Sequence, residues 1–229
     1  MIKNNLRSLL FVFGLMMNLS ILAQPNQDQL GAWYMYFWNT TIGQGPWGLQ
    51  GDVQHRNWNI AGDLEQLMLR GGLTYSPKEY KTKWTLGYAN IQTGDFGIST
   101  SRINEHRIYQ ELLYPARIGK RLYTAHRFRY EQRWVEQNEM LTRYRIMVFL
   151  NIPINNPEFE AKTFYVALYN ELFLKGQRSV EDHIFDINRL YTGVGYKIND
   201  RAKVQLGTML QRKTAWEKNQ LQFSFHHKI

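Results

Sequence analysis

The sequence predicts an all-β protein: a single antiparallel up-and-down transmembrane β-barrel of 10–12 strands, with twelve favoured, preceded by a cleavable signal peptide. Three observations lead to this prediction. The chain begins with a short apolar leader, it continues with strand-length segments that alternate apolar and polar residues, and turn-forming residues separate these segments.

The leader occupies residues 1–23. Lys3 and Arg7 make its start basic, residues 9–22 are mostly apolar, and Ala23 is a small residue suited to a cleavage boundary. Asn18 and Ser20 interrupt the apolar run, which is shorter than the roughly 20 residues of a membrane-spanning helix. We therefore predict a signal peptide over 1–23 and an exported barrel domain over 24–229. The chain has no cysteine, which excludes a lipoprotein anchor and a disulfide framework.

The alternation can be followed in individual segments. In 143–152 the even positions are all apolar or aromatic, whereas the odd positions include Arg143, Arg145 and Asn151. Successive side chains of a strand point to opposite faces, so a period of two indicates a strand with one apolar face. The same reasoning predicts eleven segments: 31–39, 46–57, 63–75, 81–92, 104–115, 120–135, 141–153, 162–174, 185–198, 202–213 and 219–229. Because bacterial barrels of one chain usually have an even number of strands, the count of eleven favours a missed twelfth strand.

Turn residues lie between the segments. Short joints are expected near 76–78, 116–120 and 199–201, and longer ones near 93–103 and 175–184. This alternation is typical of barrels with short periplasmic turns and longer outer loops. The last segment keeps Phe223, Phe225 and Ile229 on one face and resembles the terminal strand that the outer-membrane assembly machinery reads, although an aromatic residue is usual where Ile229 stands. We expect that machinery as a partner during biogenesis.

The polar faces of the segments predict the lining of the barrel. By parity the inward residues form an Arg/Glu/Tyr lining; the predicted lumen-lining and anion-binding candidates are Arg107, Glu111, Arg127, Arg129, Glu131, Arg133, Arg143, Arg145, Glu171 and Arg189. One interpretation is structural, because long Arg and Glu side chains can fill a narrow lumen and pair with one another. The other is an anion-attracting lumen, because Arg exceeds acid. Arg70 is also predicted inward, and Glu65, which differs from it in parity, is left at the strand end.

The formal charge of +9 falls to +7 when the leader, with two basic residues and no acid, is removed. In an outer membrane the expected counter-charge is lipid and lipopolysaccharide, so both are predicted partners. No motif supports nucleic-acid binding.

We find no catalytic motif, and we predict no catalytic residues, no cofactor and no metal site. Parity places His106 and His126 on the lipid-facing side. Ser179 and His183 are close in sequence, with acidic neighbours, and form the best remaining pair for hydrolysis. His226 and His227 point to opposite faces of one strand and make a poor metal pair.

Six segments have distinctive sequences: DLEQLMLR (63–70), EHRIYQE (105–111), HRFRYEQRW (126–134), RYRIMVFLNIPIN (143–155), ALYNELFLK (167–175) and FDINRLYTGVGYKI (185–198). Together they resemble the DUF2490 family, which is common in Bacteroidetes. The resemblance covers nearly all of the predicted mature chain. It implies an outer-membrane-type barrel of uncharacterised function and assigns no catalytic residues.

Three functions from different classes therefore stay open. The first is a structural, interaction or narrow-pore role in the outer membrane. The second is a barrel enzyme that modifies lipid or lipopolysaccharide, which requires a Ser/His or paired-carboxylate cluster at the rim. The third is a soluble periplasmic barrel that binds a ligand, which requires an apolar interior and a polar exterior.

Overall fold

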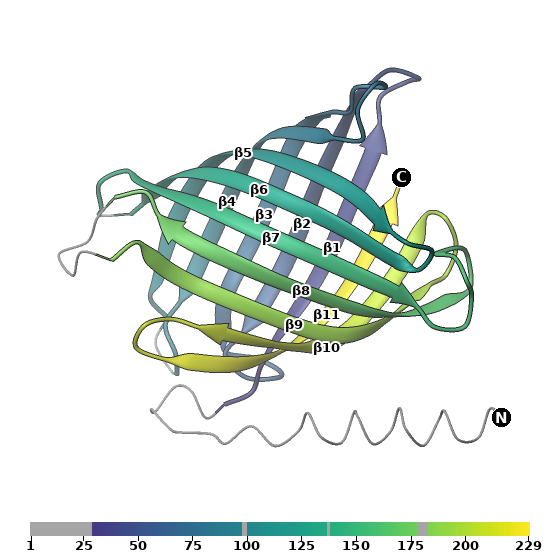
Figure 1. Ribbon diagram of the computed structural model, residues 1–229. Helices are drawn as coiled ribbons and strands as arrows, with labels where there is room; N and C mark the ends of the chain where they lie inside the picture. Colours follow the sequence, from purple (N-terminus) through teal and green to yellow (C-terminus); the bar gives the residue numbers. More distant parts are fainter. Residues whose placement is uncertain (1–28, 98–99, 137, 178–182) are drawn as a thin grey trace.

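The chain forms a closed β-barrel of eleven strands in the computed structural model, which describes residues 29–97, 100–136, 138–177 and 183–229 (Figure 1). The predicted signal peptide, 1–23, lies outside the described residues. The strands are β1 (Gly31–Thr41), β2 (Trp47–Asn57), β3 (Leu64–Tyr75), β4 (Lys83–Gly94), β5 (Arg102–Ile118), β6 (Leu122–Val135), β7 (Leu141–Pro153), β8 (Thr163–Lys175), β9 (Phe185–Lys197), β10 (Ala202–Arg212) and β11 (Glu217–Lys228). In the described part of the chain, no helix is long and apolar enough to span a membrane.

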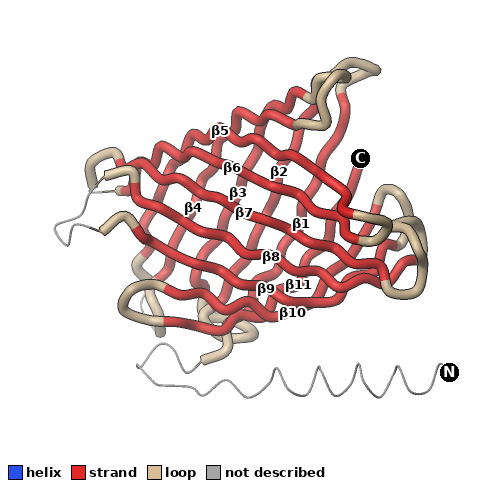
Figure 2. The backbone as a smooth tube through the Cα atoms, in the orientation of Figure 1, coloured by secondary structure: helices blue, strands red, loops and turns tan. Residues whose placement is uncertain are grey.

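The barrel closes through a parallel pair, β1 with β11, in which Tyr34 lies opposite Phe223 and Tyr36 opposite Phe225 (Figure 2). Every other neighbouring pair is antiparallel. The prediction of twelve strands is therefore wrong, whereas all eleven predicted segments are strands. An even number is needed only if every pair, including the closing one, is antiparallel. With eleven strands the first and last run in the same direction, and they pair in parallel.

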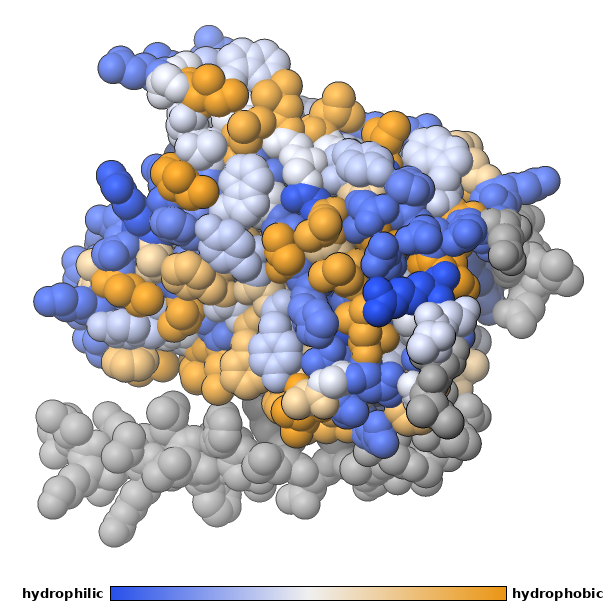
Figure 3. Space-filling model, turned by 180° about the vertical axis from the view of Figure 1, so that it is seen from behind, coloured by the Kyte–Doolittle hydropathy of each residue, from blue (hydrophilic) through white to orange (hydrophobic). Residues whose placement is uncertain are grey.

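The two faces of the wall differ in polarity. Exposed large apolar side chains recur at every second position on the outside, for example Leu86, Ile146 and Val194. Orange apolar residues are spread across the middle of the face in Figure 3. The inner positions hold most of the buried charged and amide side chains, such as Glu131 and Gln220. A polar interior and an apolar exterior are the reverse of what a soluble ligand-binding barrel requires.

Each end of the barrel is formed by five connections. We call the end where β11 finishes the C-terminal mouth; it consists of connections 42–46, 76–82, 119–121, 154–162 and 198–201 with the two adjoining residues of each strand. The N-terminal mouth, where β1 begins, consists of 58–63, 95–101, 136–140, 176–184 and 213–216 with their adjoining residues.

The joints named from the sequence lie at the expected opposite ends, but the alternation of short and long joints is not general. Connection 154–162 is as long as 176–184 and lies at the mouth that carries the short turns 119–121 and 198–201. It folds against the barrel: Phe159 packs edge-on against Tyr165 and its backbone N–H donates to the Tyr123 hydroxyl, 3.1 Å away. In the tight turn 198–201 the Asn199 side chain accepts backbone hydrogen bonds from Arg201 and Ala202.

Inward tyrosines cover inward glycines on the neighbouring strand. A Cβ at Gly195 would overlap the ring of Tyr165, and a Cβ at Gly87 would overlap the ring of Tyr109. Both tyrosines are at most 2% exposed. Glycine at these positions thus lets an aromatic ring lie flat on the inner wall, an arrangement that restores packing at a strand glycine.

Candidate functional site

The inner face of β5 to β9 forms one continuous array of charged side chains, which we call the charged wall. It contains Glu105, Arg107, Glu111, Arg127, Arg129, Glu131, Arg133, Arg143, Arg145, Glu171, Asp186 and Arg189. These residues meet because alternate positions of adjacent antiparallel strands share the inner face. Arg129, for instance, lies in register with Glu111 on one side and Arg145 on the other.

Glu131 lies at the centre of the charged wall and is 1% exposed. Its carboxylate accepts hydrogen bonds from Arg143 Nη2 at 2.7 Å and from Arg145 Nη1 at 2.7 Å. Arg107 and Arg129 each place a guanidinium nitrogen 3.7 Å from it. Four cations therefore surround one carboxylate, and this compensates for the large desolvation cost of burying the charges.

The other acidic side chains are shared in the same way. Glu171 accepts from Arg127 and Arg145, each at 2.5 Å. Glu105 accepts from Arg107 at 2.6 Å and from Arg133 at 2.5 Å. Each arginine thus joins or approaches the carboxylates of neighbouring strands, so the pairs form one connected network rather than separate bridges.

Aromatic rings stabilise some of the arginines, which outnumber the carboxylates in the charged wall. The ring of Phe173 lies 4.4 Å from the Arg145 guanidinium carbon and 4.6 Å from that of Arg189. Tyr109 lies 4.4 Å from that of Arg129. The negative face of an aromatic ring stabilises a cation where no further carboxylate is present.

The opposite side of the lumen, on β10, β11, β1 and β2, is lined mainly by neutral groups, and we call it the amide wall. Its neutral polar side chains are Gln50, Gln54, Gln205, Gln211, Gln220, Gln222 and Ser224, and its buried charged ones include Asp52, Arg56 and Lys218. Gln222 Oε1 accepts from the Tyr169 hydroxyl at 3.0 Å, and Gln211 Oε1 accepts from Arg189 Nε at 2.7 Å. Contacts such as these connect the amide wall to the charged wall across the lumen.

Trp33, 2% exposed, is the largest apolar side chain of the amide wall. The Arg56 guanidinium lies 3.8 Å from its ring, and that of Arg189 lies 4.9 Å from it. The indole N–H donates to Glu65 at 3.3 Å. The Trp33 indole therefore contacts two guanidinium groups and also donates a hydrogen bond to a carboxylate.

The structure places all ten predicted lining residues in the lumen and brings them into the charged wall. Their anion-binding role stays a prediction. Arg70 also faces inward and pairs with Asp52 at 2.9 Å. Glu65, left at the strand end in the prediction, is the second residue of β3; the register shifts there, between Arg56 and Asn57 of β2, and the irregularity turns Glu65 inward, where it is 9% exposed.

Sequence reasoning missed the glutamines and a serine–histidine contact in the lumen. Ser224 Oγ lies 3.1 Å from His226 Nε2, and it also donates to Gln205 at 3.4 Å. The sequence could have predicted this contact, because Ser224 and His226 share parity on one strand. The imidazole stacks on Phe37 and lies in register with Lys203. Neither Phe37 nor Lys203 can accept a hydrogen bond, so neither supplies the orienting acceptor that a catalytic imidazole needs.

The other hydrolytic candidates named from the sequence are the Ser179/His183 pair, His106 and His126. Ser179 lies outside the described residues, so the Ser179/His183 pair is not described. His106 and His126 lie on the outer face, and His106 Nδ1 is 2.5 Å from the Tyr88 hydroxyl. Within the described ranges, no group of three or more metal-binding side chains is found.

The fold and lumen define a class: a closed β-barrel with an apolar outer surface and an ion-paired interior. The family model of DUF2490, described as a protein of unknown function, matches residues 30–222. The chain therefore belongs to this family. No curated protein and no solved structure matches the chain.

Proposed function

We propose that the protein is an outer-membrane β-barrel with a sealed lumen, which serves a structural or interaction role rather than forming an open pore. The observation that carries this proposal is the inverted polarity of the wall. Alternate outward positions are apolar, which suits lipid, while the charges are collected and paired inside. The predicted leader over 1–23 supports export.

The packing of the lumen supports the sealed state. Glu131, Glu171 and Arg129 are 1%, 3% and 4% exposed, although they lie midway along the barrel. Water thus hardly reaches the side chains that would line a pore. In addition, each carboxylate of the charged wall already binds at least one arginine, so a permeating ion would have to break these contacts.

The test is single-channel recording of the refolded protein, residues 24–229, in planar bilayers of phosphatidylcholine. Insertion is verified independently by flotation with phosphatidylcholine liposomes and by a heat-dependent shift in gel mobility. We expect no discrete openings from inserted protein. Anion-selective openings would contradict the sealed lumen and favour the narrow pore; failure to float with liposomes would contradict the membrane location.

A further inference from the structure

The two mouths of the barrel differ strongly in charge. The C-terminal mouth carries eleven cationic side chains and four acidic ones: Lys78, Lys81, Lys83, Arg117, Lys120, Arg121, Lys162, Lys197, Arg201, Lys203 and Lys228, with Glu79, Glu158, Glu160 and Asp200. Among the described residues of the N-terminal mouth, six cations face seven acids: Arg56, Arg102, Lys175, Arg212, Lys213 and Lys218, with Asp63, Glu65, Asp95, Glu136, Glu139, Asp186 and Glu217. The positive charge is therefore concentrated at one end of the molecule.

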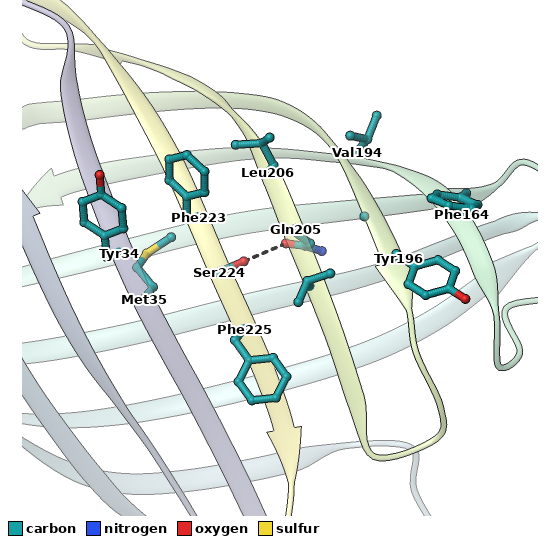
Figure 4. Close-up of a pocket in the computed structure, with 12 residues that line it drawn as sticks. Tyr34, Met35, Phe164, Val194, Tyr196, Gln205, Leu206, Phe223, Ser224 and Phe225 are labelled. Atoms are coloured by element: carbon teal, nitrogen blue, oxygen red, sulfur yellow. Dashed lines mark hydrogen bonds between the residues drawn. The ribbon is translucent and has the colours of Figure 1, made fainter. Parts of the chain in front are cut away.

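A groove of about 480 Å³ runs over the outer face of β8, β9, β10, β11 and β1 (Figure 4). Aromatic side chains lie on both sides of it, with Phe223 and Phe225 on one side and Phe164 and Tyr196 on the other. Smaller side chains lie between them: Val194 and Leu206, and Val204, which is in register with Phe225 on one side and Tyr196 on the other. Its volume is within the range of about 300 to 1,000 Å³ typical of small-ligand sites.

The basic mouth adjoins this groove. Three exposed cations stand at the rim of the mouth, beyond the edge of the groove: Lys162 is two residues before Phe164, and Lys228 is three residues after Phe225, at a position that shares the inward parity of Ser224 and His226. Arg201 lies between them in space, because its backbone carbonyl accepts a hydrogen bond from the Lys228 N–H at 2.7 Å. The backbone of Lys162 is likewise bonded to Lys197 at 2.7 Å.

Two acids offset part of this charge: Glu160 is two residues before Lys162, and Asp200 interacts with both Lys197 and Lys228, so four local cations face two acids. Asp200 accepts a hydrogen bond from the Lys197 ammonium at 2.8 Å, and that contact lowers the pKa of the Asp200 carboxyl. Asp200 is therefore engaged by Lys197. Lys162, Arg201 and Lys228 are left as the exposed cations closest to the apolar groove.

We propose that this surface binds an anionic, phosphate-bearing membrane lipid, with its phosphate against Lys162, Arg201 and Lys228 and one acyl chain in the groove. Cationic side chains near a membrane surface attract anionic headgroups, and the apolar groove favours a chain over water. The cations lie at the end of the barrel and the apolar groove lies further along the same strands. A lipid has the same order, with its charged headgroup at one end and its acyl chain beyond it. This inference rests on the proposed function, because it requires the barrel to span a bilayer.

The test uses nanodiscs of phosphatidylcholine with 20 mol % of the anionic lipid phosphatidylglycerol, a fraction of roughly one in five chosen so that both lipids compete. The protein is released into the mass spectrometer and the retained lipids are counted. We expect wild-type protein to retain phosphatidylglycerol at least about fivefold over its share of the bilayer. The triple change Lys162→Gln, Arg201→Gln, Lys228→Gln should abolish this enrichment.

Three further variants make the result specific. The matched triple change at the other mouth, Lys175→Gln, Arg212→Gln, Lys213→Gln, should keep the enrichment, and its loss would show a general charge effect and overturn the site. Val194→Trp should fill the groove and reduce retention at least about threefold, whereas Leu86→Trp, on the outer face of β4, should not.

The outcomes separate the inference from the proposed function. Protein that inserts into phosphatidylcholine but retains both lipids in proportion to the bilayer overturns the lipid site alone. Protein that does not insert overturns the membrane barrel itself. A dimer that persists without phosphatidylglycerol and is lost in Val194→Trp would assign the groove to a second copy and likewise overturn the lipid site.

Discussion

The charged wall and the amide wall line the same lumen but satisfy their polar groups differently. In the charged wall, one carboxylate serves several guanidinium groups, as Glu131 does for Arg143 and Arg145. In the amide wall, most contacts have at least one neutral partner; some join two neutral groups, as between Tyr169 and Gln222, and others join an amide to a charge, as between Gln54 and Arg56. Buried charges must be compensated or their cost is large, whereas a neutral hydrogen bond contributes only about 1 kcal/mol. The barrel therefore depends unequally on its two sides.

The largest expected effect follows from removing the central carboxylate with Glu131→Gln. The change removes the negative charge and replaces one of the two acceptor oxygens, which bind Arg143 and Arg145, by an amide donor, in a site that is 1% exposed. We expect the free energy of unfolding to fall by about 3 to 5 kcal/mol. Urea unfolding of the refolded protein in phosphatidylcholine liposomes, followed by tryptophan fluorescence, measures this quantity.

A matched acid at the C-terminal mouth provides the control. Glu158 pairs with Arg117 at 3.1 Å, but its side chain is 63% exposed. Glu158→Gln should change stability by about 0 to 1 kcal/mol. If Glu131→Gln were equally mild, water would have to reach the charged wall, and the sealed lumen would be wrong.

The amide wall contains the parallel closure of the barrel, which can be strengthened covalently. Tyr36 and Phe225 are paired across β1 and β11, and the natural chain has no cysteine that would compete. Tyr36→Cys with Phe225→Cys should form a disulfide under mild oxidation and stabilise the barrel by about 2 to 4 kcal/mol. Non-reducing gel electrophoresis, with mass spectrometry of the linked peptide, detects the bond.

The control pair is Tyr36→Cys with Leu221→Cys. Leu221 lies four residues from the partner of Tyr36, roughly 13 Å along the strand, which is beyond the reach of a disulfide. Efficient linkage of this pair would mean a different register, and linkage of neither pair would contradict closure by eleven strands.

The fold was predictable in most respects because the period-two pattern is local. Each predicted strand contains its own evidence, as 143–152 does, and the same parity places Arg129 and Glu171 inside. The closing pair was not predictable in this way, because strands about 190 residues apart in sequence leave no local pattern that states their direction. The general rule of even numbers then favoured twelve strands where the segments themselves indicated eleven.

The candidate site, like the fold, was predictable only where the sequence pattern is local. Parity identifies which residues face inward, but it does not identify partners several strands apart, such as Trp33 and Arg189. It also fails where the register shifts, as it does before Glu65. The glutamines of the amide wall were not predicted as lining residues, because a neutral side chain on a polar face is compatible with either a lumen or solvent.

The smallest effect tests the amide wall itself. Gln222→Leu removes the acceptor of the Tyr169 hydroxyl; Gln222 is buried and Tyr169 is partly buried. We expect a loss of about 1 to 2 kcal/mol in urea unfolding, because one neutral donor is left unsatisfied. Adding Tyr169→Phe removes that donor as well and should restore most of the loss. No equally simple repair exists for Glu131→Gln, whose arginines belong to a connected network. If the double change were no more stable than Gln222→Leu alone, the two walls would be coupled more strongly than pairwise contacts allow.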